Sequence, residues 1–190
     1  MPQYSLGLYE KAMPDGLSFR EMLELTKRTG FDRLELSIDE SDMRLARLDW
    51  TSDQVRALKC MMDDSSILIR TMCLSGHRKY PLGSHDPAIR ERSLEIMRKA
   101  VGLAAELGIA IIQLAGYDVY YETGDEETRA WFAQNLAIST EMAAKAGVLL
   151  GFETMETPFM DTVGKAMAYV DLVGSPYLGV YPDIGNLKNA

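Results

Sequence analysis

The chain has 190 residues, of which 47% are hydrophobic, and it carries a formal net charge of −8 at pH 7 with a pI near 4.8. This composition is ordinary for a globular domain, and the acidic balance argues against binding to nucleic acid or to an anionic membrane. The opening segment MPQYSLGLYE lacks the features of a signal peptide, and no window is apolar enough to cross a membrane. With Cys60 and Cys73 in no metal or redox spacing, we expect a cytoplasmic protein with buried, reduced thiols.

Short apolar segments alternate with helix-like segments along the chain. Six segments predict strands: 5–10, 33–39, 66–75, 109–116, 148–156 and 177–183. The third to fifth are almost continuously apolar, as in parallel strands that are covered on both faces. This alternation predicts a parallel α/β fold in one domain, residues 1–190.

The helices between these strands have recognisable beginnings and ends. Three beginnings carry capping residues: Ser18 with Glu21, Thr51 with Gln54, and Asp86 followed by Pro87. Two later helices are predicted, one with Phe132, Leu136 and Ala143 on its buried side and one over roughly 161–173. Four helix-like stretches end at a glycine that leads into an apolar strand: Gly30, Gly108, Gly147 and Gly174.

Two folds share this pattern: a doubly wound open sheet and a (β/α)₈ barrel. A dinucleotide-binding sheet would carry a GxGxxG motif after its first strand, and LYEKAMPDG has none, which favours the barrel. A complete barrel needs about 250 residues. The sequence therefore predicts an incomplete TIM barrel with about six of its eight units.

Polar residues at the predicted strand ends are the candidates for chemistry, because active sites of parallel α/β folds lie there. They are Glu10, Glu35, Asp39, Ser75, His77, Gln113, Glu153, Glu156 and Asp183. Glu153 and Asp183 follow apolar strands, where a carboxylate is costly unless it is paired or bound to metal. They are either ligands of a divalent cation or carboxylates that are paired with Lys or Arg or solvated.

A basic run, His77, Arg78 and Lys79, follows the third strand. Such a run could hold a substrate phosphate or could be a solvated loop, and the residues alone leave both open. His85 precedes a helix start and is expected to have a structural or solvent role. The sequence has no nucleophile elbow, CxxC motif or Walker loop. The missing elbow and the presence of only two histidines argue against a hydrolytic triad.

Several motifs together resemble the L-ribulose-5-phosphate (L-xylulose-5-phosphate) 3-epimerases, a family of xylose-isomerase-like TIM barrels. They are LGLYEKAMP, ELSIDESDMRLARLDW, MCLSGHRKYPLGS, EIMRKA, IQLAGYDVYYE and YPDIGNL. The resemblance implies a metal-dependent epimerisation of a ketopentose 5-phosphate, with one carboxylate removing the C3 proton and a second returning it through an enediolate. Mn, Mg and Zn all suit such a site.

By this resemblance Glu153 is a metal ligand and an acid/base, and Asp183 is a metal ligand. Substrate binding is expected from Glu10, His77, Arg78, Lys79 and Gln113. The family's remaining ligands, a histidine and a glutamate that is also the second acid/base, would lie beyond Ala190. We therefore expect weak metal binding and weak or no epimerase activity from the isolated chain.

Two other functions are alternatives to an epimerase. One is a non-catalytic half-barrel that binds a sugar phosphate or acts as a scaffold. The other is a nuclease of the apurinic-endonuclease type, which two histidines and a net charge of −8 argue against. The expected partner is a small sugar phosphate rather than nucleic acid or membrane. Family resemblance and unpaired edges of the first and sixth strands both predict a homo-oligomer, in the simplest case a dimer.

Overall fold

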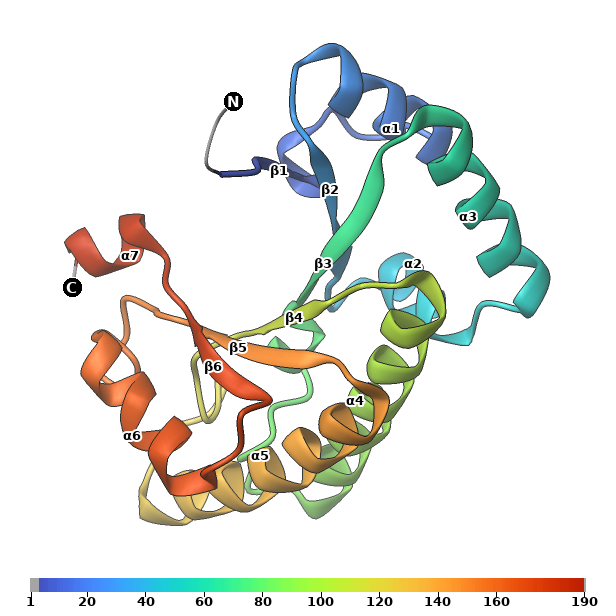
Figure 1. The fold of residues 1–190 in the computed structure, drawn as a ribbon. Coiled ribbons are helices and arrows are strands. Elements are labelled where there is room, and N and C mark those ends of the chain that lie inside the picture. The colour runs from blue at the N-terminus through green and yellow to red at the C-terminus, as the bar shows by residue number, and fades with distance from the viewer. Residues whose placement is uncertain (1–3, 190) are drawn as a thin grey trace.

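The computed structural model describes residues 4–189, which are built around one parallel sheet in the order β1-β2-β3-β4-β5-β6 (Figure 1). The strands are β1 (Gly7–Tyr9), β2 (Arg33–Ile38), β3 (Leu68–Leu74), β4 (Ile111–Leu114), β5 (Leu149–Glu153) and β6 (Leu178–Tyr181). Each strand lies inside a range predicted from the sequence. The pairing of neighbours along the chain is that of consecutive barrel units.

Helices connect successive strands, and their capping residues act as predicted. The helices are α1 (Phe19–Arg28), α2 (Asp42–Leu45), α3 (Ser52–Ser65), α4 (Pro87–Leu107), α5 (Glu126–Ala146), α6 (Val163–Val173) and α7 (Ile184–Asn189). Ser18 and Thr51 form the capping boxes of α1 and α3, and Asp86 caps α4. The helices α2 and α7 were not predicted, because they are too short to show a helical period. Three 3-10 turns were not predicted either: Glu10–Ala12, Ala46–Asp49 and Ser75–Arg78.

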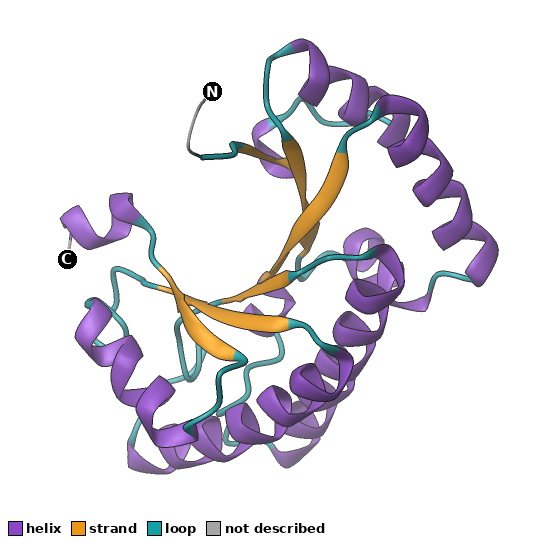
Figure 2. Cartoon of the chain, in the orientation of Figure 1, coloured by secondary structure: helices purple, strands orange, loops and turns teal. Residues whose placement is uncertain are grey.

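The core lies between the convex face of the sheet and the helices that surround it (Figure 2). In β2, Leu34, Leu36 and Ile38 alternate with polar residues and are fully buried. Phe132 of α5 and Phe152 of β5 pack against each other in the same layer, with ring centroids 6.0 Å apart. This burial of alternate residues leaves the other set on the concave face.

The sheet is an open arc: within residues 4–189, β1 and β6 are the end strands and do not pair with each other. Figure 1 shows the helices on the outer side of the arc and α7 at the end of the chain that faces β1. The incomplete barrel predicted from the sequence is thus what the described residues form. No helix in this range combines the length and apolar character that a bilayer span requires. Cys73 is buried as predicted, whereas Cys60 is exposed on α3.

Candidate active site

The concave face of the sheet is lined by polar and small side chains. Strand register places these residues side by side: Tyr9 with Glu35, Glu35 with Thr71, Ser37 with Cys73, Cys73 with Gln113, Gln113 with Gly151, and Glu153 with Tyr181. A face that packed against another apolar layer would not carry this set. The concave face is therefore the surface of the sheet that can hold a polar ligand.

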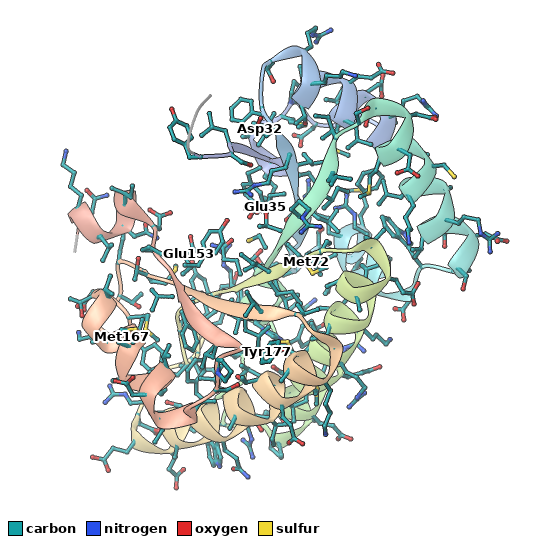
Figure 3. The ribbon with its side chains drawn as sticks, in the orientation of Figure 1. Asp32, Glu35, Met72, Glu153, Met167 and Tyr177 are labelled. Carbon is teal, nitrogen blue, oxygen red and sulfur yellow. The ribbon has the colours of Figure 1, made fainter. Side chains whose placement is uncertain are left out.

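A cleft of about 400 Å³ opens on this face at the carboxyl ends of the strands. Its lining residues are Tyr9, Lys11, Glu35, Cys73, Ser75, Arg78, Gln113, Glu153, Tyr181 and Asp183. Its volume lies in the range of small-molecule sites. Figure 3 shows Glu35 and Glu153 reaching this side of the sheet from β2 and β5. Other surface pockets of similar size lie over the outer helices, away from these carboxylates.

Glu153 is the most perturbed carboxyl group of the cleft. Burial, together with the nearby charges of Asp183 and Glu35, raises its pKa to about 7, against the opposing effect of Arg78. A carboxyl group with this pKa exchanges its proton at neutral pH. The repulsion between Glu153 and Asp183 also marks a place where a cation would be stabilised.

Hydrogen bonds between side chains and backbone groups connect the segments that carry Glu153 and Asp183. The hydroxyl of Thr154, directly after Glu153, accepts a hydrogen bond from the Asp183 backbone N–H at 3.0 Å. Asn186 completes the connection, since its side chain donates to the Thr154 carbonyl at 2.9 Å and its backbone N–H donates to Asp183 Oδ1 at 2.9 Å. The ends of β5 and β6 are thereby held together at the two carboxylates.

Two glycines allow close approach around the same groups. A Cβ on Gly116 would lie 2.1 Å from the Glu153 carbonyl oxygen, so the loop after β4 passes Glu153 only because residue 116 lacks a side chain. A Cβ on Gly151 would lie 3.2 Å from the Cβ of Tyr181. Gly151 thus leaves room for the Tyr181 ring, whose hydroxyl donates to Glu35 at 3.0 Å.

The three residues of the basic run after β3 lie in different surroundings. Only Arg78 lines the cleft, with its guanidinium carbon 4.8 Å above the centre of the Tyr120 ring. His77 is buried beside α4 with Nε2 3.2 Å from the Ser93 carbonyl oxygen, and burial lowers its pKa to about 4. Lys79 is exposed and lies near the Tyr80 ring. Neither His77 nor Lys79 is among the residues that line the cleft.

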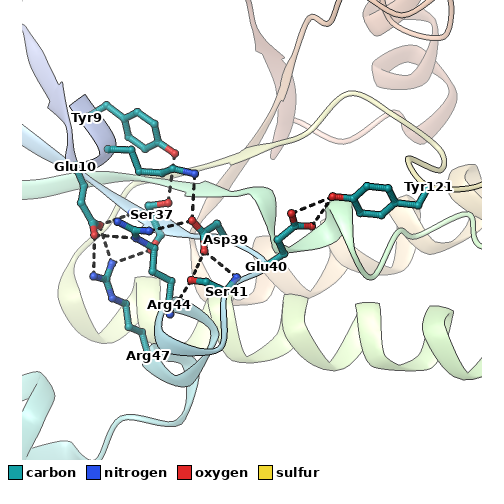
Figure 4. A network of polar contacts seen from close by, with 10 residues as sticks. Tyr9, Glu10, Ser37, Asp39, Glu40, Ser41, Arg44, Arg47 and Tyr121 are labelled. Atoms are coloured by element: carbon teal, nitrogen blue, oxygen red, sulfur yellow. Dashed lines mark hydrogen bonds and ion pairs between the residues drawn. The ribbon is translucent and has the colours of Figure 1, made fainter. Parts of the chain in front are cut away.

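Glu10 belongs to a buried ion-pair network next to the cleft (Figure 4). Arg47 donates to both of its carboxylate oxygens at 2.7 Å, and Arg44 donates to Oε1 at 3.2 Å. Burial opposes ionisation of Glu10, but the hydrogen bonds and charge of Arg47 outweigh it and lower the pKa. Arg44 also contacts Asp39, which binds Lys11 at the edge of the cleft. The carboxylate of Glu10 is therefore paired with two arginines, and Glu10 does not line the cleft.

Of the predicted site residues, the structure brings Arg78, Gln113, Glu153 and Asp183 into one cleft. Glu35 and Ser75 stand on the list of polar strand ends and also line it. Four residues that line the cleft were not predicted as site residues: Tyr9, Lys11, Cys73 and Tyr181. The alternation of residues within the strands could have identified Tyr9, Cys73 and Tyr181, because each shares a face with a polar strand-end residue.

Comparisons with known proteins agree with this geometry. The family model described as "Xylose isomerase-like TIM barrel" matches residues 23–190. The chain is 49% identical over 186 residues to the L-ribulose-5-phosphate 3-epimerases UlaE of Salmonella typhimurium and Salmonella paratyphi B, covering 98% of this chain and 66% of each of theirs. The chain thus spans 66% of the length of these curated relatives.

Solved structures show the same fold at low sequence identity. A D-psicose 3-epimerase crystallised in the presence of D-fructose has a TM-score of 0.82 at 18% identity, over 97% of this chain and 65% of that one. The D-psicose 3-epimerase from Clostridium cellulolyticum H10 with D-tagatose gives 0.83 at 18% identity, with the same coverage. The apo 3-keto-D-glucoside 4-epimerase from E. coli gives 0.80 at 16% identity, over 98% and 70%.

Proposed function

Because this chain belongs to the xylose isomerase-like TIM barrel family, we propose that it acts in the 3-epimerisation of a ketopentose 5-phosphate such as L-ribulose 5-phosphate. The observation that carries the proposal is Glu153, a buried carboxyl group with a pKa of about 7 beside Asp183 in the cleft. The 49% identity to proteins named L-ribulose-5-phosphate 3-epimerase supports the choice of substrate.

Glu153 is proposed as the general base that removes the C3 proton. This proton lies next to the ketone at C2 and is a weak acid, so the base must be unprotonated yet basic enough to take it. A pKa near the working pH meets both demands, and burial beside Asp183 provides it. We assign only this abstraction step to residues of the chain. The acid that returns the proton on the opposite face is implied by the family resemblance to lie after the sixth strand.

Glu153 and Asp183 fit a divalent cation as two hard oxygen donors whose mutual repulsion a cation would relieve. Within residues 4–189 they have no third His, Cys, Asp or Glu in a ligating arrangement. A bound Mn²⁺, Mg²⁺ or Zn²⁺ would supply positive charge beside the substrate carbonyl oxygen and so acidify the C3 proton. Thr154 and Asn186 hold the ends of β5 and β6 together, and the Asn186 backbone N–H orients the Asp183 carboxylate.

Conversion of L-ribulose 5-phosphate to L-xylulose 5-phosphate, followed by NMR with added Mn²⁺ or Mg²⁺ and again with chelator, tests the proposal. Conversion that chelator stops would support a metal-dependent 3-epimerase. Binding of the sugar phosphate with neither conversion nor proton exchange at C3 would instead support the non-catalytic binding function. The Asp183→Asn variant is the control for the cation, because it removes one ligand charge and leaves Glu153 in place.

A further inference from the structure

The loop between β4 and α5 lies beside the cleft, and residues 120–125 are its exposed part. The centre of the Tyr120 ring lies 4.8 Å from the guanidinium carbon of Arg78, which lines the cleft. Residues 120–125 are exposed except for Glu122, which is half-buried. Within the described residues 4–189, the backbone of residues 120–124 makes no hydrogen bond to another backbone group. Side-chain contacts therefore decide how firmly this loop is held beside the cleft.

Two side-chain attachments hold the 120–125 loop. The Tyr121 hydroxyl lies 3.0 and 3.3 Å from the two carboxylate oxygens of Glu40, in the segment after β2 (Figure 4). Glu122 and Asp125 contact His85, just before α4: Glu122 Oε2 lies 3.0 Å from Nδ1, and Asp125 Oδ2 lies 3.0 Å from Nε2. The loop thus spans from the segment after β2 to the start of α4.

Only a protonated His85 ring satisfies both of its contacts. A neutral imidazole has one N–H and one lone pair, so its second nitrogen would face a carboxylate oxygen with lone pair against lone pair. The imidazolium donates from both nitrogens, and each hydrogen bond is then charge-assisted. The hydrogen bonds with Asp125 and then Glu122 accordingly raise the pKa of His85. Loss of the proton removes one ring hydrogen bond and the attraction of the ring to both carboxylates.

Two further charged groups lie next to His85. Arg90 of α4 donates to the His85 carbonyl oxygen at 3.1 Å, and Asp86 follows His85 in the chain and caps α4. Arg90 disfavours a protonated ring and Asp86 favours it, so their effects oppose each other. Glu122 and Asp125, in direct contact with the ring nitrogens, therefore dominate the protonation of His85.

We propose that His85 acts as a pH-dependent latch for the 120–125 loop: the protonated ring holds the loop, with Tyr120 over Arg78, and loss of the proton loosens it. The end of the cleft at Arg78 is then more open at alkaline pH than at acidic pH. The proposal goes beyond the proposed function, because it concerns access to the cleft and needs no step of the epimerisation.

Cleavage by chymotrypsin after Tyr120 and Tyr121 tests the proposal, because an exposed loop is cut in proportion to its open population. Wild type and His85→Gln are compared at the same pH, so the pH dependence of the protease cancels. We expect the wild type to be cut about two- to fivefold more slowly at about pH 6, as for an exposed ion pair, and at the same rate at about pH 9. Asp125→Asn, which keeps an N-cap oxygen for α5, should lose part of the protection at about pH 6. Glu126→Gln is the matched control: it removes a neighbouring charge that makes no ion pair with His85 within residues 4–189, and should behave as the wild type.

An NMR titration of the His85 C2 proton, identified by its absence from His85→Gln, measures the protonation itself. We expect a midpoint above the ordinary value of about 6.5, and a lower midpoint in Asp125→Asn than in the wild type. Three results would overturn the proposal: a midpoint at or below the ordinary value, equal cleavage of wild type and His85→Gln at about pH 6, or a difference that persists at about pH 9. Circular dichroism checks the fold of each variant, and if His85→Gln does not fold, Asp125→Asn carries the cleavage comparison. None of these measurements involves turnover, so a chain without epimerase activity would refute the proposed function alone.

Discussion

The hydroxyl of Tyr181 in β6 donates a 3.0 Å hydrogen bond to Oε2 of Glu35 in β2. The two strands are separated by three others in the sheet, so the bond crosses the concave face instead of following the ladder. Burial and the charge of Glu35 raise the pKa of Tyr181 to about 12, so the tyrosine remains the donor at every physiological pH. The pair connects the two sides of the cleft and places Glu35 within electrostatic reach of Glu153.

Removing this hydroxyl should destabilise the arc measurably. We expect Tyr181→Phe to lower the free energy of unfolding by about 1 kcal/mol, because a half-buried carboxylate loses its donor. Urea unfolding followed by circular dichroism measures it. Tyr177→Phe, just before β6, is the matched control, since no hydrogen bond of the Tyr177 hydroxyl occurs in residues 4–189. Equal effects of the two substitutions would mean that the Tyr181–Glu35 bond contributes nothing specific.

His77 should make stability fall as the pH falls. Its pKa is about 4 when folded and about 6.5 when unfolded, so the unfolded state binds the extra proton between these values. The stabilisation is fully present above the unfolded pKa and is lost as the pH falls toward the folded one. Between pH 7 and pH 5 the His77 contribution should fall by about 2 kcal/mol, so His77→Gln should lose less stability than the wild type in urea titrations over that range.

His85 is a control for His77, because its effect on the pH dependence of stability has the opposite sign. It is exposed and lies 3.0 Å from both Asp125 and Glu122, and the hydrogen bond with Asp125, followed by that with Glu122, raises its pKa. Its contribution is therefore present below the unfolded pKa and is lost as the pH rises through the folded one. His85→Gln should make the loss of stability between pH 7 and pH 5 steeper, whereas His77→Gln makes it shallower. A change of the same sign in both variants would contradict the assigned environments.

The strands and the barrel architecture could be predicted because they depend on local patterns. The apolar runs at 66–75 and 109–116 contain β3 and β4, and Asp86 before Pro87 begins α4 as expected. A strand end also limits where chemistry can occur, which is why Glu153 and Asp183 could be expected to lie in the same cleft. Both inferences need only sequence neighbours and the rule that parallel strands end at the same edge.

The partners of each polar group could not be predicted, because they come from distant segments. Glu10 resembles the other strand-end carboxylates in sequence, but its carboxylate accepts hydrogen bonds from Arg47, which lies 37 residues later in the chain. His77 and Arg78 are neighbours, yet the turn at Ser75–Arg78 directs one toward α4 and the other into the cleft. Tyr181 reaches Glu35 across 146 residues. Such choices depend on tertiary packing, which a local pattern does not contain.

The Glu10–Arg47 pair should be far more important for stability than surface ion pairs. The side chains are 3% and 9% exposed, so Glu10→Gln would leave a buried guanidinium without its counter-charge. We expect a loss of about 3 kcal/mol in urea unfolding. Asp53→Asn breaks the exposed pair with Arg56 and is the control, with an expected change of at most about 0.5 kcal/mol. A small effect of Glu10→Gln would show that Arg47 finds another partner or water.

Gly116 should be intolerant of any side chain. Gly116→Ala would place a Cβ 2.1 Å from the Glu153 carbonyl oxygen, so the loop or the end of β5 must shift. We expect thermal unfolding to show a loss of roughly 1–3 kcal/mol. Gly102→Ala in α4 has no atom within 4 Å of the new Cβ and should stabilise the chain by about 0.5–1 kcal/mol. Similar effects at both positions would contradict the close approach at Gly116.

Solvent-deuterium incorporation at C3 of L-ribulose 5-phosphate, followed by NMR in D₂O with Mn²⁺, tests the central claim that Glu153 is the base. We predict incorporation by the wild type and a rate at least about 100-fold lower for Glu153→Gln, since general-base catalysis typically contributes that much. Glu156→Gln, three residues along and outside the cleft, should keep the wild-type rate. Incorporation that is unchanged in Glu153→Gln, or absent from the wild type, would contradict the assignment.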